Sequence, residues 1–230
     1  MIQFYRCGIR MVLVGIFCGS LGCATSPTAV KPAPAFSGCC GPQIKGVCMA
    51  SYYDRKGLLY ITQQTHWFCP CQRSLQIRAN EPEGEFSWRL HNDTFSVAGP
   101  HKNSIPNIPF DKMLSLAVLY SMASSTELLS QPVSLPAEPI KLEGQWYIPI
   151  TSHIADTTIT ILKSRDTGRF DLVKIQDNKT ALLAQSYNFR FDKTLQKNIP
   201  QTIDVFDITN GLSFKKLVLQ LQYIQIETQN

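Results

Sequence analysis

The sequence has little that would indicate an enzyme or a nucleic-acid-binding protein. It contains no G-x-S-x-G nucleophile motif, no H-E-x-x-H zinc motif and no glycine-rich phosphate loop. The four histidines are far apart and stand beside no patterned carboxylate: His66, His91, His101 and His153. The 22 Lys and Arg residues are scattered and exceed the 17 Asp and Glu residues too little to indicate nucleic acid. These absences favour a non-enzymatic protein without metal or cofactor.

Long apolar runs are also missing after residue 35, so no membrane span is expected there. The N-terminal run, MVLVGIFCGSLG at residues 11–22, is shorter than the roughly 20 residues a span needs. It has the length of a secretory apolar segment, and Arg6 and Arg10 precede it. We therefore predict a secretion signal over residues 1–22.

The residues around Cys23 resemble the lipobox of bacterial lipoproteins. In that family the signal is cut before a cysteine whose thiol then carries lipid, including acyl groups such as palmitate. Ser20 stands where the family usually has Leu, so cleavage after Ala24 and a retained anchor remain alternatives. By the same resemblance, Ala24 after the cysteine implies sorting to the outer membrane, facing the periplasm, in a two-membrane bacterium.

A proline-rich stretch, ATSPTAVKPAPA, follows Cys23 and carries a single charge, Lys31. Such a segment buries little apolar area and serves as an extended tether about 35 Å long. The expected organisation is a signal at residues 1–22, a lipidated cysteine and tether at 23–41, and one domain at 42–230. The rest of the chain is long enough for a single core.

Alternation of apolar and polar residues dominates from Ile44 onward. FSWRL (86–90), YNFRF (187–191) and LVLQLQYIQIE (217–227) all show a period of two, which is typical of strands with one buried face. Turn signals such as DRKG, EPEG, DTG and TNG separate these runs at short intervals. We expect about nine strands in an antiparallel meander.

One segment, NIPFDKMLSLAVLYSM, instead has helical spacing. Asn107 is the expected cap, and Asp111 suits the positive end of the helix dipole. The helix, expected over Asn107–Ser121, is apolar nearly all round, which indicates burial on more than one side. A short second helix is possible near Thr126–Ser130. The expected fold class is mainly β with one or two helices, a curved antiparallel sheet packed on a buried helix.

Five cysteines remain after the signal and Cys23, all in the N-terminal third: Cys39, Cys40, Cys48, Cys69 and Cys71. Export would favour disulfides, although an odd number leaves one thiol over. HWFCPCQ (66–72) leaves two further interpretations open. Its His66, Cys69 and Cys71 could bind zinc with another cysteine, or the C-x-C pair could exchange thiols.

The turn DRKG allows a prediction of which cysteines pair. If Tyr53 faces Leu58 across a regular hairpin, Cys40 faces Cys71 and Cys48 faces Gln63. Cys40–Cys71 is therefore the preferred disulfide. Cys39 or Cys48 with Cys69 is the next candidate.

The order of elements resembles the LolA/LolB-like superfamily of lipoprotein carriers and outer-membrane lipoprotein receptors, which includes the MucB/RseB N-terminal domain. GQWYIPI (144–150), residues 157–191 and NIPQTIDVFD (198–207) carry the resemblance, which covers roughly residues 42–228. It implies a half-open barrel with an apolar concave face, a helix as its lid, and acyl chains or lipoproteins as partners.

The strands' apolar faces carry more area than one short helix can cover, so we expect an apolar pocket between helix and sheet. Its predicted lining is Trp88, Leu114, Leu119, Trp146 and Phe189. The expected function is a lipid- or acyl-chain-binding module in the bacterial envelope, anchored to the membrane by lipid. The alternatives are a structural lipoprotein with a filled core, and a redox or metal-binding envelope protein using the cysteines.

Overall fold

The computed structural model describes residues 43–69, 72–81, 84–92, 94–98, 111–123, 138–142, 144–193 and 195–227. The chain divides into two compact units, Met1–Ala35 and Phe36–Asn230, and every described residue belongs to the second. The predicted signal, Cys23 and the whole predicted tether lie outside the described residues.

Twelve strands and one helix make up the described part of the chain. They follow one another as β1 (Gln43–Asp54), β2 (Gly57–Cys69), β3 (Ser74–Glu81), β4 (Gly84–His91), β5 (Thr94–Ala98), α1 (Lys112–Ala123), β6 (Ile140–Leu142), β7 (Gln145–Ile154), β8 (Thr157–Ser164), β9 (Phe170–Gln176), β10 (Ala181–Asp192), β11 (Lys197–Asp207) and β12 (Phe214–Glu227).

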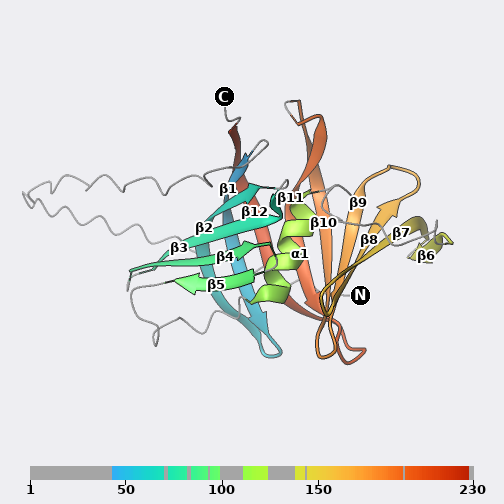
Figure 1. Ribbon diagram of the computed structural model, residues 1–230, viewed down its shortest axis with the longest axis horizontal. Helices are drawn as coiled ribbons and strands as arrows, with labels where there is room; N and C mark the ends of the chain where they lie inside the picture. Colours follow the sequence, from blue (N-terminus) through green and yellow to red (C-terminus); the bar gives the residue numbers. More distant parts are fainter. Residues whose placement is uncertain are drawn as a thin grey trace, which may run out of the picture. The chain divides into compact units, whose positions relative to one another are not determined.

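All twelve strands belong to one antiparallel sheet (Figure 1). The order is β5-β4-β3-β2-β1-β12-β11-β10-β9-β8-β7-β6, so each strand before β12 pairs with its neighbour in sequence except across α1. The first and last strands meet near the centre of the sheet, where Ala50 pairs with Leu219. The predicted meander is confirmed.

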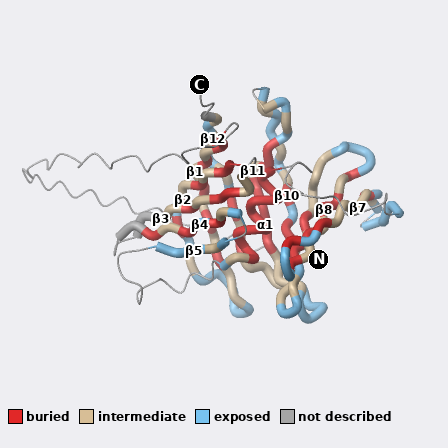
Figure 2. Tube along the Cα trace, viewed as in Figure 1, coloured by how far each residue is buried: buried red, intermediate tan, exposed pale blue. Residues whose placement is uncertain are grey.

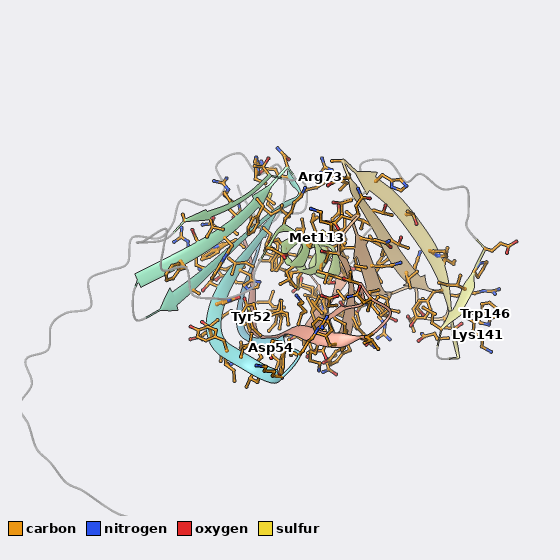
Figure 3. The ribbon with its side chains drawn as sticks, turned by 90° about the horizontal axis from the view of Figure 1, so that it is seen from below. Tyr52, Asp54, Arg73, Met113, Lys141 and Trp146 are labelled. Atoms are coloured by element: carbon orange, nitrogen blue, oxygen red, sulfur yellow. The ribbon has the colours of Figure 1, made fainter. Side chains whose placement is uncertain are left out.

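The sheet curves around α1. The helix packs against β9, β10 and β11 and also against β3 and β4. Because β2, β1 and β12 separate these two groups in the sheet, a flat sheet could not bring both to one helix. Figure 3 shows Met113 of α1 between the two arms of the sheet. Among the described residues β5 and β6 each pair on one side only, so the sheet is curved but not closed.

Period-two burial explains why the strands form and where the core lies. On β1, Cys48, Ala50 and Tyr52 are buried, while the residues between them are half-buried. Buried segments run through the middle of the strands and along α1, and the turns are exposed (Figure 2). The predicted fold class, a curved antiparallel sheet on a buried helix, is confirmed.

The predicted number of strands was too small because several tight turns lack glycine and proline. Residues 140–164 alone contain three strands, β6, β7 and β8. The turn from β7 to β8 uses Ala155, whose φ is 52°. Gln196, at a φ of 53°, does the same in the hairpin of β10 and β11. Left-handed turns are uncommon at such residues, so composition did not reveal them all.

Helix α1 begins at Lys112, and Asp111 is its cap. The Oδ1 atom of Asp111 accepts a hydrogen bond from the Leu114 backbone nitrogen at 2.9 Å. The prediction of Asn107 as cap was therefore wrong, because Asp111 itself precedes the first helical turn. Residues 124–137, where a second helix was expected, lie outside the described residues.

The β1–β2 hairpin contains a bulge that the sequence did not reveal. Tyr53 pairs with Leu58 as predicted, but Tyr52 pairs with Tyr60, so Leu59 is an extra residue. Every pair beyond it shifts by one, and Cys48 faces Gln64 rather than Gln63. The register from which the Cys40–Cys71 disulfide was predicted is therefore wrong.

Candidate ligand site

The side chains of β7 on the concave face of the sheet become less buried toward the sheet edge at β6. Ser152 and Ile154 are buried at one end, Ile148 and Ile150 are half-buried, and Trp146 is 42% exposed. A period of two places these five residues on one face of the strand. We call the part formed by Trp146, Ile148 and Ile150 the β7 apolar face.

The β7 apolar face lies outside the strands against which α1 mainly packs, which are β9, β10 and β11. Figure 3 shows Trp146 beside Lys141 at the far edge of the sheet, away from Met113 of the helix. The ammonium of Lys141 lies 5.9 Å from the centroid of the Trp146 ring. Apolar side chains on a concave face without complete cover are suited to an apolar ligand.

A pocket of about 120 Å³ lies at one end of the sheet, which we call the turn pocket. It is lined by residues 167–170, Phe189, Lys197 and Asn198. These residues come from the turn between β8 and β9 and from the hairpin of β10 and β11. Figure 1 shows both connections at the same end of the sheet.

Hydrogen bonds to Ser164 fix the β8–β9 turn. Its hydroxyl accepts a hydrogen bond from the Thr167 nitrogen at 3.3 Å, and its carbonyl accepts one from Gly168 at 2.9 Å. Its own nitrogen donates to the Arg169 carbonyl at 2.7 Å. Gly168 has a φ of 68°, which favours glycine. The turn is thus ordered before any ligand arrives.

Arg169 is the central charged group of the turn pocket. Its guanidinium lies 4.9 Å from the centroid of the Phe189 ring, which is within cation–π range. Its Nε is 3.6 Å from Oδ1 of Asp171, too far for a hydrogen bond. Within the described part of the chain, neither of these two buried atoms has a hydrogen-bond partner. Burial raises the pKa of Asp171, and Arg169 opposes this more weakly.

Polar side chains also enter the core on β2. His66 is fully buried, and its Nε2 is 3.0 Å from Oε1 of Gln64. The Gln64 amide donates in turn to the Tyr52 hydroxyl at 2.8 Å. Burial lowers the pKa of His66 to about 3, so the ring is neutral at ordinary pH.

The described cysteines fit neither zinc binding nor thiol exchange. Cys69 is fully buried and disulfide-bonded. Cys48 is a free thiol, and burial raises its pKa to about 12, so the Cys48–Cys69 pair is excluded and no reactive thiolate forms there. No group of three potential metal ligands occurs among the described residues. Cys39, Cys40 and Cys71 lie outside these residues, so the remaining pairings stay predictions.

The residues predicted to line one pocket lie on several elements of the fold. Trp88, Leu114 and Leu119 are at most 2% exposed and belong to the core between helix and sheet. Trp146 is on the β7 apolar face, and Phe189 lines the turn pocket. A single pocket shared by these five residues stays a prediction.

Sequence reasoning missed Arg169, Lys197 and Asn198. DTG was recognised as a turn, and the aromatic residues of YNFRF as strand residues. Nothing in either segment shows that the two approach each other, because their proximity depends on the pairing of β8 to β11.

The same fold occurs in a solved structure. A LolA superfamily protein from Nitrosomonas europaea matches 80% of this chain and 85% of its own, with a TM-score of 0.53 and 10% sequence identity. The fold is LolA-like. At this identity the LolA-like classification describes the fold alone.

Other comparisons add little to the LolA-like fold. A DUF1329 family protein from Desulfovibrio piger matches 80% of this chain and 85% of its own, with a TM-score of 0.45 and 7% identity. No protein-family model matches the chain, and no curated protein matches it in sequence. Among the described residues, none of the helices has the length and hydropathy of a transmembrane segment.

Proposed function

We propose that this protein is a non-enzymatic lipid-binding module of the bacterial envelope that holds an acyl chain on the concave face of its sheet. The observation that carries the proposal is the β7 apolar face in a LolA-like fold. An acyl chain gains roughly 0.8 kcal/mol for each buried CH₂ group. A chain placed along Trp146, Ile148 and Ile150 would therefore bind measurably. A role in lipoprotein sorting at the outer membrane is a narrower form of the same proposal.

We further propose that Cys23 carries lipid and anchors the domain to the outer membrane through the proline-rich tether. The support is the charged start, the short apolar run and Gly22 before Cys23. The Cys23→Ala variant is expected to move from the detergent phase to the aqueous phase in a partition assay. Identical partitioning of variant and parent would contradict the lipid anchor.

The acyl-binding proposal is tested with an environment-sensitive probe bearing an uncharged methyl-ester head group, used below its micelle point. Ile148→Asn places an amide on the β7 apolar face and should weaken uptake about tenfold. Thr151→Asn is the matched control, because Thr151 is half-buried on the opposite face of β7. Circular dichroism establishes that both variants fold. A folded parent that takes up no probe would refute the proposal.

A structural lipoprotein with a filled core is the second candidate. It is favoured by the burial of Leu114, Leu119 and Trp88, all of which belong to the hydrophobic core. Absence of probe uptake, with a cooperative and stable fold, would support it.

A further inference from the structure

The turn pocket lies where two neighbouring strands part. β9 and β10 are paired from Leu172 to Gln176, opposite Gln185 to Ala181. Beyond Gln185, β10 continues to Asp192 without β9 beside it among the described pairs. The pocket therefore lies at a gap in the sheet, between the two hairpin ends that frame it.

Cations and aromatic rings surround this gap. Arg169 is stacked on Phe189, and Lys197 is part of the lining. The ammonium of Lys163 lies 5.8 Å from the centroid of the Phe170 ring. Asp171 is the acid in contact with Arg169. Asp192, opposite Lys197 in the hairpin, accepts a hydrogen bond from the Leu195 nitrogen.

The size of the turn pocket excludes a complete lipid. Its volume of about 120 Å³ corresponds to about four water molecules at roughly 30 Å³ each, whereas drug-sized ligands need at least about 300 Å³. A single polar head group fits. The Arg169 side chain is 39% exposed, so its guanidinium would donate charge-assisted hydrogen bonds to an anionic oxygen.

Phe170 connects the pocket to the apolar interior, since it lines the pocket and also packs against the core. Its register partner Lys163 is in turn paired with Ile148 of the β7 apolar face. We infer that the turn pocket binds the phosphate or carboxylate head group of an anionic amphiphile, with Arg169 and Lys197 as its partners. The amphiphile's chain follows Phe170 to the β7 apolar face. This inference rests on the proposed acyl-chain binding.

The test compares two probes with the same acyl chain, one ending in a carboxylate and one in its methyl ester. Arg169→Gln should weaken binding of the carboxylate probe about tenfold and leave the ester unchanged. Arg165→Gln is the matched control, because Arg165 is exposed in the same turn and does not line the pocket. Its affinities for both probes should equal those of the parent.

Asp171→Asn should act in the opposite direction. It removes the acid that competes for Arg169, so the carboxylate probe should bind several-fold more tightly and the ester as before. This gain cannot arise from misfolding. Inorganic phosphate distinguishes the sources of the anion: weak competition supports an amphiphile, whereas competition as strong as that of the carboxylate probe overturns the inference in favour of a free-anion site.

The outcomes separate this inference from the proposed function. If both probes bind the parent and all three variants equally, the head-group site is refuted and acyl binding stands. If neither probe binds, both are refuted.

Discussion

At the scale of single residues, a row of hydrogen-bonded side chains, Tyr52, Gln64 and His66, brings polar groups into the core. Each side chain is almost completely buried, and two hydrogen bonds, of 2.8 and 3.0 Å, link all three. Buried polar groups stabilise a fold only when they are paired. The pairing here depends on a neutral imidazole, which makes the fold sensitive to acid.

His66 should make stability fall as the pH is lowered. Burial lowers the pKa of His66 from 6.5 to about 3. Below pH 6.5 the imidazole is therefore protonated in the unfolded chain but stays neutral in the folded one. The free energy of unfolding should then drop by up to about 1.4 kcal/mol per pH unit, until the pH reaches the folded pKa. Urea unfolding at pH 7.5 and pH 5.5 measures this loss, and His66→Gln should reduce it.

His153→Gln is the control, since His153 is exposed on β7. It should keep the pH dependence of the parent. An unchanged dependence in His66→Gln would show that His66 is not the group that titrates.

The residue scale is also where sequence reasoning was least reliable. The turn that joins β1 to β2 was predicted correctly, and so was its first pair, Tyr53 with Leu58. The bulge at Leu59 was not, because Leu59 has neither a glycine nor a proline beside it in LLYI. One extra residue changes every later partner, so a disulfide predicted from register depends on a detail that composition does not contain.

At the scale of elements, α1 is a helix without a solvent face. Eleven of its residues, Met113 to Ala123, are buried. This was predictable from the sequence, because apolar residues surround the helix on nearly every side. Burial on all sides leaves its stability dependent on packing and on the cap at its first turn.

Replacing the cap should measurably destabilise the domain. Asp111→Ala removes the acceptor for the Leu114 nitrogen and should cost about 1 kcal/mol in the free energy of unfolding. Asp111→Asn keeps a side-chain oxygen there and should stay close to the parent. Urea unfolding of the three proteins measures this. Equal stability of Asp111→Ala and the parent would argue against the cap.

At the scale of the whole domain, the alternation of the sequence predicted strands and their antiparallel pairing. It did not predict that β1 would lie beside β12, because no local signal distinguishes a central strand from an edge strand here. Nor did it predict the turn pocket, which depends on the packing of β8 to β11. Features within one element were thus more predictable than those that join distant elements.

Substitution by proline should destabilise the domain more in a central strand than in an edge strand. Val218 of β12 pairs with Ser51 on one side and Asp204 on the other. Val218→Pro should abolish cooperative unfolding, because it disturbs the ladder at the centre of the sheet. Ile140→Pro, in the edge strand β6, should cost much less. Thermal unfolding followed by circular dichroism compares them, and similar losses would contradict the central role of β12.

The pairing of β1 with β12 also has a consequence for how fast the domain can fold. Its flanks are hairpins that close locally, but Gln43 pairs with Glu227 across almost the whole length of the domain. Such a closure has a high entropic cost before any contact offsets it, and long-range pairings of this kind slow folding. The two flanks can form early, whereas their union into one sheet must wait for the last strand. Until then β1 and β11, which both pair with β12 in the finished sheet, carry open strand edges. In this interval a newly made chain most needs protection from aggregation.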